Sequence, residues 1–347
     1  MFIHTADWHI GKPLKDVTDS LSRQIEAVTV ILDYANKSEY CNAVLVAADV
    51  FDDYEPPQHV KDAFLDVVLT YDRKMNCPVY IMEGNHSTAH DYSNLKTFVT
   101  LYNFKKLKWF KFITTPKLMV NEAMAISIVP HGFNYNTVPR KHAAKVKRIG
   151  KPWVVMLHDL LHGSTLESGK VVENKQSGKL IQVPGVRYYA CGDVHKAGRV
   201  AGKANAWYCG SPIQHTFGEH LPKGFLLVNE QEKYPKPRLI KEPLDHIKKL
   251  VTITDIQQAP TAEEAYVKYK RVDDSDVSEQ IPDNVITVED VILEQETVND
   301  EGAAADVIKS IDREKELFLF LKRQKGYSSR KLTLAKRLVG DLFTNAV

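Results

Sequence analysis

The chain begins with the stretch FIHTADWH (residues 2–9), in which an apolar, β-prone run stops at two polar residues of kinds that bind metal ions. Residues 2–6 have the composition of a strand that is covered on both faces, as in a parallel sheet. Asp7 and His9 follow directly. The pattern predicts a buried strand whose carboxyl end carries an aspartate and a histidine.

The same pattern recurs four more times along the chain. Apolar or β-prone runs lie at residues 43–48, 78–82, 153–157 and 187–191. The polar residues at their ends are Asp49, Asn85 with His86, His158, and Asp193 with His195. In open α/β architectures, functional groups gather at the carboxyl ends of strands. We therefore expect these five strand ends to meet, because the repetition of one pattern is more informative than any spacing within it.

These residue types suit a pair of divalent metal ions. Aspartate oxygens and neutral imidazoles bind manganese, zinc or iron, and one carboxylate can bridge two ions. We assign the bridge to Asp49, and Asn85 supplies a neutral carbonyl oxygen. Two cations about 3.5–4 Å apart can hold a phosphodiester, activate water and neutralise the charge of in-line displacement. The sequence predicts two-metal hydrolysis of a phosphoester.

The leaving oxygen of such a reaction needs a proton. His86 lies next to a predicted ligand and is not needed as one, so we expect it to act as the general acid, which is worth roughly 10²–10⁴-fold in rate. Asp52 could accept a hydrogen bond from the other ring nitrogen of His86 and fix its tautomer. The alternative is that Asp52 caps the following turn.

The order of these motifs resembles the calcineurin-like metallophosphoesterase superfamily. They are D-x-H at residues 7–9, D-x-x-D at 49–52, G-N-H at 84–86, a single histidine at 158 and G-x-x-H at 192–195. Further stretches resemble the SbcD branch, the nuclease subunit of a double-strand-break repair complex: HTADWHIG (4–11), VFD (50–52) with PP (56–57), and GSPI (210–213) with FGE (217–219).

The resemblance implies two groups of metal ligands that share Asp49. One group is Asp7, His9, Asp49 and His195, and the other is Asp49, Asn85, His158 and Asp193. Two divalent ions are implied, Mn²⁺ first and Mg²⁺ as the alternative.

Three positions depart from the family pattern. Ala48 stands where the family has glycine, Ser87 where it has an acidic residue, and Asp193 where it has histidine. Because a carboxylate is a harder ligand than an imidazole, Asp193 should shift the preference towards manganese or magnesium.

The alternation of strand-like and amphipathic helical stretches predicts a layered α/β fold flanked by helices, and the resemblance implies a β-sandwich core. Amphipathic helices are expected at residues 21–38 and 59–75. We divide the chain into a metallophosphoesterase (nuclease) domain (1–229), a small capping domain (230–272) with a strand at 250–254, and an acidic linker (273–302) with a short strand at 285–288. A C-terminal helix-loop-helix (303–347) completes the chain.

The C-terminal pair has two apolar faces that a detached helical hairpin cannot bury by itself. The resemblance implies that residues 303–347 grip the coiled coil of an SbcC-like ATPase. The alternatives are that these helices fold back on the core or bind DNA through their basic residues.

A homodimer is also expected, through residues 59–75 and 92–102. These stretches have more apolar surface than one sheet face needs, namely Phe64, Val67, Val68, Leu95, Phe98, Val99 and Leu101. The alternative is that both are ordinary core helices.

Composition limits the remaining possibilities. The 347 residues carry a net charge of +2, so a DNA surface must be a local patch. The basic stretches at 105–111 and 140–151 are candidates, and solvated helix faces are the alternative.

Four cysteines without C-x-x-C spacing indicate buried thiols in a reducing compartment. No signal segment or apolar span is evident, so we expect a cytoplasmic protein, in the host cytoplasm if phage-encoded, that binds no membrane.

Three functions agree with these features. The first is a DNA nuclease, exonucleolytic at duplex ends and endonucleolytic on single strands or hairpins, that acts with an SbcC-like ATPase in recombination and repair. The second is a phosphatase or cyclic-nucleotide phosphodiesterase with the same metal core. The third is a non-catalytic scaffold for DNA ends, which only Ser87 and Asp193 favour.

Overall fold

The computed structural model describes residues 1–14, 17–85, 88–89, 92–102, 106–173, 179–271, 282 and 284–290, with the backbone alone at 88–89, 92–93, 271 and 287–290. These residues belong to one compact unit, Met1–Ile292. His86, Ser87 and the predicted C-terminal helices at 303–347 lie outside the described residues. Among the described residues, no helix is both long and apolar enough to cross a membrane.

A first six-stranded sheet has the order β14-β13-β1-β2-β3-β6. Its strands are β1 (Phe2–Thr5), β2 (Val44–Val46), β3 (Val79–Met82), β6 (Phe110–Ile113), β13 (Phe225–Val228) and β14 (Arg238–Ile240). The four strands from β1 to β6 are parallel, and β13 is antiparallel to both of its neighbours. The apolar runs at the start of the chain therefore form adjacent parallel strands, as predicted.

A second six-stranded sheet has the order β11-β12-β10-β9-β8-β7. Its strands are β7 (Lys117–Val120), β8 (Ala125–Val129), β9 (Trp153–His158), β10 (Val186–Gly192), β11 (Gly198–Arg199) and β12 (Ala206–Tyr208). The central strands β8, β9, β10 and β12 are parallel, and the two edge strands are antiparallel. The carboxyl ends of β9 and β10 thus lie side by side.

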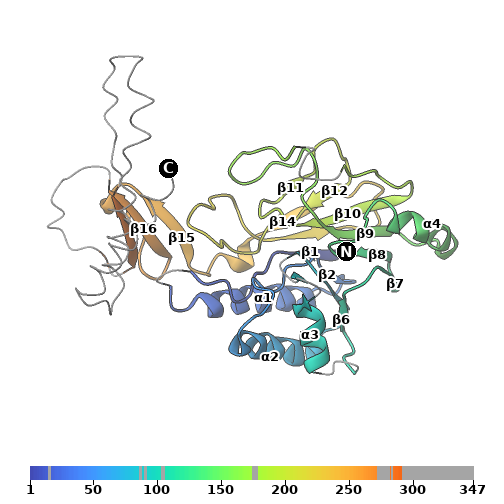
Figure 1. Ribbon diagram of the computed structural model, residues 1–347, viewed down its shortest axis with the longest axis horizontal. Coiled ribbons are helices and arrows are strands. Elements are labelled where there is room, and N and C mark those ends of the chain that lie inside the picture. Colours follow the sequence, from blue (N-terminus) through green and yellow to red (C-terminus); the bar gives the residue numbers. More distant parts are fainter. Residues whose placement is uncertain are drawn as a thin grey trace, which may run out of the picture. The chain divides into compact units, whose positions relative to one another are not determined.

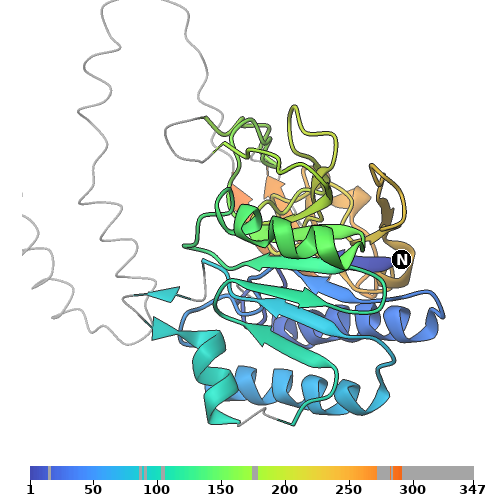
Figure 2. The ribbon, with the colours of Figure 1, turned by 90° about the vertical axis from the view of Figure 1, so that its right-hand side faces the viewer.

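The helices cover the outer faces of the two sheets. They are α1 (Ser20–Lys37), α2 (Gln58–Lys74), α3 (Asn94–Leu101) and α4 (Val138–Ile149). Figure 2 shows α2 and α3 on the first sheet, the second sheet stacked on it, and α4 on the far side. One core fills the space under α1 and α2, a second lies between the sheets and a third lies under α4. The predicted α/β class with layered sheets and flanking helices is confirmed.

A small parallel sheet follows the two large ones (Figure 1). It contains β15 (Lys249–Ile253), β16 (Ala265–Arg271) and β17 (Val285–Asp290) in that order. The strands predicted at 250–254 and 285–288 are confirmed as β15 and β17. Because β17 pairs with β16, these residues of the predicted linker belong to the small sheet. Single-turn 3₁₀ helices at Glu242–Leu244 and Ile256–Gln258, and the short strands β4 (Thr88–Ala89) and β5 (Tyr92–Ser93), complete the elements.

The apolar residues of α2 and α3 are mostly internal. Those in the core are Phe64, Val67, Val68, Leu95 and Phe98. Val99 is half-buried, and Leu101 is 56% exposed. The prediction of excess apolar surface on these helices is therefore wrong for most of these positions. Their side chains pack in the core beneath their own sheet. The homodimer itself stays a prediction. All four cysteines are buried free thiols, as expected.

Candidate metal centre

The ends of five parallel strands bring the predicted ligands together. Asp7 and His9 follow β1, Asp49 follows β2 and Asn85 follows β3. His158 is the last residue of β9, and Asp193 and His195 follow β10. The stacked sheets place the first three ends against the last two, which explains why residues distant in sequence share one site.

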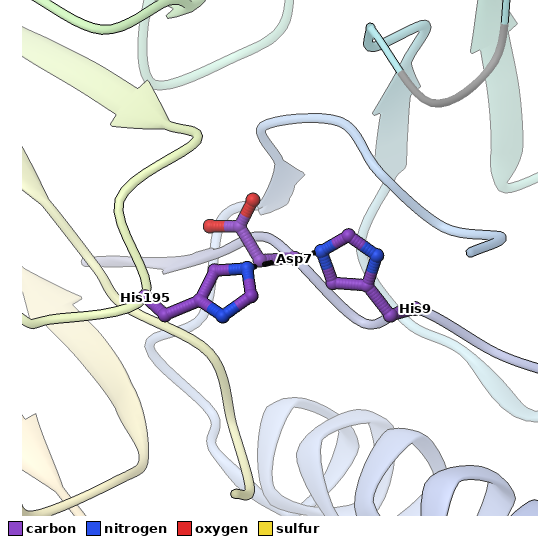
Figure 3. Close-up of side chains that lie close together, drawn as sticks. All are labelled: Asp7, His9 and His195. Carbon is purple, nitrogen blue, oxygen red and sulfur yellow. Dashed lines mark hydrogen bonds between the residues drawn. The ribbon is translucent and has the colours of Figure 1, made fainter. Parts of the chain in front are cut away.

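One cluster consists of Asp7, His9 and His195, whose ligand atoms all lie within 4.8 Å of one another. The Nε2 atoms of His9 and His195 are 3.1 Å apart. Figure 3 shows a ring nitrogen of each histidine directed towards the other ring, beside the Asp7 carboxylate. Asp7 and His9 are 0% and 1% exposed, so these groups are held away from bulk water.

A second cluster consists of Asp7, Asp49 and His158, again with ligand atoms within 4.8 Å. Nε2 of His158 lies 3.1 Å from Oδ2 of Asp49 and 3.0 Å from Oδ1 of Asn85. Oδ1 of Asp193 is 3.7 Å from the same nitrogen, and it accepts a hydrogen bond from Nδ2 of Asn85. Asp193 therefore lies beside the second cluster, next to His158 and Asn85.

All three histidines present the same nitrogen to the clusters. Nδ1 of His158 donates to the carbonyl oxygen of Ala47 at 2.8 Å, so in the neutral ring the lone pair is on Nε2. Nδ1 of His9 lies 3.1 Å from Oδ1 of Asp52, and Nδ1 of His195 lies 3.2 Å from Oε1 of Glu219. Metal-binding histidines are characteristically oriented by an oxygen at the second ring nitrogen. The arrangement is the one that imidazole ligands require.

Distances and charges also fit divalent cations. Neighbouring donors around one ion with bonds of about 2.0–2.2 Å lie roughly 3 Å apart, as the nitrogens of His9 and His195 do. Burial raises the pKa of Asp7. Burial alone would lower the pKa of His158, but Asp49 and the other nearby carboxylates outweigh it and raise the pKa to about 10. The clusters thus attract positive charge, which a proton on His158 supplies when no cation is bound.

Asp52 contacts His9, a contact that the sequence did not predict. Its carboxylate lies 3.1 Å from Nδ1 of His9 and accepts from Nζ of Lys12 at 3.0 Å. Burial opposes its ionisation, but these two partners lower the pKa of Asp52 to about 2. Asp52 therefore orients a predicted metal ligand. Its pairing with His86, which lies outside the described residues, stays a prediction.

Glu219 is a supporting residue that sequence reasoning missed. Besides His195, it contacts Nζ of Lys223 at 2.8 Å and accepts from the backbone N–H of His215. In the sequence, the FGE stretch at 217–219 is only one of the motifs that resemble the SbcD branch. His215 is buried, and its Nε2 donates to the carbonyl oxygen of Asp7 at 2.8 Å. Both residues shape the strand ends from outside the ligand groups.

The backbone at the site is strained. Among the described residues, five non-glycine residues have positive φ, namely Asp7 (53°), His9 (44°), Ala48 (79°), Asp49 (48°) and Asp193 (94°). Four of them are predicted ligands, and such conformations cluster at functional sites. Two glycines allow close packing there. A Cβ on Gly84 would lie 2.0 Å from Oδ1 of Asp49, and one on Gly192 would lie 2.1 Å from the carbonyl oxygen of Ala47.

Comparison with known proteins agrees with this geometry. The SbcD subunit of nuclease SbcCD from Bacillus subtilis strain 168 is 33% identical over 87 residues, which are 24% of this chain and 21% of that protein. The SbcD subunit from Escherichia coli K12 is 21% identical over 251 residues, 62% of this chain and 61% of the relative. The matched segments thus span about three fifths of the Escherichia coli protein and about one fifth of the Bacillus protein.

A model of the calcineurin-like phosphoesterase family matches residues 1–197, more than half of the 347-residue chain. The matched region contains all seven predicted ligands and both buried Asp/His clusters. The chain belongs to the calcineurin-like phosphoesterase family and is distantly similar to SbcD nuclease subunits.

Proposed function

We propose that this protein is a two-metal phosphodiesterase that cleaves DNA. The observation that carries the proposal is the shared orientation of His9, His158 and His195. Each has an oxygen at Nδ1 and directs Nε2 towards buried aspartates. A structural histidine cluster would not need that common direction, whereas a metal centre does.

We assign the ligands to the two groups that the family resemblance implies, and Asp7 contributes to both buried clusters. Asp7, His9, Asp49 and His195 would hold one ion, and Asp49, Asn85, His158 and Asp193 the other. When bound, two divalent ions supply an activated water and neutralise the charge on the phosphoryl group. Asn85 and Asp193 hold each other through a hydrogen bond of 3.3 Å, which fixes both side chains of the second group. Mn²⁺ suits this oxygen-rich group, with Mg²⁺ as the alternative.

The remaining chemical step is protonation of the leaving oxygen. We assign it to His86, which follows Asn85 directly. His86 then acts as a general acid without binding metal. Asp52 acts on His9, and through it on the position of the first ion.

DNA is favoured as substrate by the SbcD-like motifs and by the similarity to the SbcD subunits of nuclease SbcCD. On that basis we propose exonuclease activity at duplex ends and endonuclease activity on single strands and hairpins. An SbcC-like ATPase bound to residues 303–347 and a homodimer belong to the same proposal. The scaffold alternative is less favoured, because Oδ1 of Asp193 lies 3.7 Å from Nε2 of His158 and can still act as a ligand.

The decisive assay compares substrates on one preparation. Labelled hairpin DNA, a duplex with free ends, bis(4-nitrophenyl) phosphate and 4-nitrophenyl phosphate are each incubated with Mn²⁺ or Mg²⁺. We expect Mn²⁺-dependent cleavage of the DNA substrates. A preference for the phosphomonoester would indicate a phosphatase, and binding of DNA without any hydrolysis would indicate a scaffold.

Two variants serve as internal controls. Asp49→Ala should lose bound metal and every activity together, because it removes the shared carboxylate. His86→Ala should keep its metal and its DNA binding and lose cleavage. Loss of metal from the His86 variant would contradict its assignment as the acid.

A further inference from the structure

A basic cavity lies beside the metal centre and outside its ligand groups. It has a volume of about 270 Å³ and lies between α1, the segment 212–223 and the segment 241–249 that leads into β15. Five cations line it: Arg23, Lys223, Lys241, Lys248 and Lys249. The lining contains a single carboxylate, Asp245. The cavity therefore has the charge to attract an anion.

Arg23 is the distinctive residue of this cavity. It is 3% exposed, although arginine is seldom buried without a partner. Nε and Nη2 both donate to the carbonyl oxygen of Lys248, at 3.1 and 2.7 Å. Nη1 is buried and has no acceptor among the described residues. The two hydrogen bonds to one carbonyl oxygen fix the wall of the cavity at Lys248.

The acidic neighbours do not neutralise this wall. Lys223 pairs with Glu219 and Glu167, both at 2.8 Å. Lys249 lies 3.9 Å from Asp245, and both side chains are more than half exposed, so that pair is weak. Lys241 and Lys248 form no ion pair in the described part of the chain. Asp19 and Glu26 offset the charge of Arg23, so the surplus positive charge of the cavity lies on Lys241, Lys248 and Lys249.

Guanidinium and ammonium groups together are the usual partners of phosphate. The cavity volume of about 270 Å³ lies just below the range of small-molecule sites, which begins near 300 Å³. A phosphate group with part of a sugar fits that size better than a large ligand does. Lys223 also donates to the carbonyl oxygen of His195, so the cavity shares one side chain with the metal centre.

We propose that this cavity binds the phosphate group of a nucleotide ligand, which is either a free mononucleotide or one phosphodiester of a DNA strand. Lys241, Lys248 and Lys249 supply its charge, and Arg23 holds the wall through the carbonyl oxygen of Lys248. This site is separate from the proposed catalytic function, since its residues need no metal to bind an anion.

Calorimetric titration in excess chelator tests the proposal without involving the metal centre. The probes are inorganic phosphate, thymidine 5′-monophosphate, thymidine and a short oligothymidylate. We expect the monophosphate to bind with a Kd of about 1 mM or lower, and thymidine not to bind. Tighter binding of the oligothymidylate, weakened by salt, identifies a DNA strand as the ligand, whereas binding of the monophosphate alone identifies the mononucleotide. The proposal would be overturned if thymidine bound as tightly as thymidine 5′-monophosphate. It would also be overturned if neither the monophosphate nor the oligothymidylate bound.

Variants assign the binding to this cavity. Lys241→Gln with Lys249→Gln removes two exposed charges and should weaken binding roughly tenfold. Arg23→Lys should weaken it as well, because lysine cannot make both contacts to the Lys248 carbonyl oxygen that hold this wall. Lys117→Gln with Lys236→Gln, two exposed lysines outside the cavity and outside the candidate DNA surfaces, is the matched control and should bind as wild type does. If Arg23→Lys does not fold, the double variant at Lys241 and Lys249 still tests the site. The site is contradicted if this variant binds as wild type does, or if the control variant loses the same affinity.

Discussion

Replacing Glu219 by glutamine removes one negative charge from behind the metal centre and keeps the shape of the side chain. Glu219 lies 3.2 Å from Nδ1 of His195 and 2.8 Å from Nζ of Lys223. Burial alone would raise its pKa, but His195 and Lys223 outweigh it and lower the pKa from 4.5 to about 2. That difference corresponds to about 3 kcal/mol in favour of the ionised carboxylate.

Part of that free energy should appear as metal affinity. The carboxylate increases the basicity of His195 and holds its ring, and the loss of such a partner typically costs 10–100-fold in metal binding. For Glu219→Gln we therefore expect Mn²⁺ affinity to fall by about 1.4–2.7 kcal/mol. The measurement is calorimetric titration of Mn²⁺ into chelator-stripped protein, with the melting temperature recorded in parallel.

Glu167→Gln is the matched control for this variant. Glu167 also contacts Nζ of Lys223 at 2.8 Å, and it accepts from the backbone N–H of Leu221, but no contact to His195 is present. It should bind Mn²⁺ as wild type does. If both variants lose the same affinity, the effect belongs to Lys223. If Glu219→Gln binds Mn²⁺ normally, the reasoning about His195 is refuted.

Three further predictions follow from the same geometry. Gly84→Ala should lower the melting temperature and abolish Mn²⁺ binding, because its Cβ would lie 2.0 Å from Oδ1 of Asp49; normal binding in calorimetry would count against the packing described here. Asp193→His should leave an active enzyme whose ratio of Mn²⁺ to Zn²⁺ activity shifts towards zinc, and an unchanged ratio in a hydrolysis assay would show that Asp193 is no ligand. For the metal-free protein, the pKa of Glu219 is lowered to about 2, so its stabilisation is complete above the unfolded value of 4.5 and is lost as the pH falls towards 2. Urea unfolding between pH 5 and pH 2 should therefore show a shallower loss of stability for Glu219→Gln, and parallel curves would contradict this.

The sequence allowed the strands and most of the site to be predicted because both have local signals. Continuous apolar runs mark strands that are buried on both faces, and the ligands follow them directly. β1, β2, β3, β9 and β10 were predicted in this way, together with α1 and α2. The edge strands β7 and β11 are short and partly exposed, and they have no such run.

The contacts behind the ligands could not be predicted, since they join residues that are distant in sequence. His195 and Glu219 are 24 positions apart, and nothing in either segment indicates the other. The amphipathic pattern of the first helix likewise gave no sign of a buried arginine at position 23. Periodicity also identified the apolar faces of α2 and α3 correctly without indicating that their own sheet covers them.

The central claim is that two divalent cations bind where the five strand ends meet. Its most direct test is anomalous-difference density from crystals grown with Mn²⁺. Two peaks about 3.5–4 Å apart are predicted, with Asp49 between them, His9 and His195 at one, and His158 at the other. The Asp193 carboxylate should lie within about 2.6 Å of the second peak. A single peak, peaks away from Asp49, or density nowhere near these residues would contradict the two-metal account.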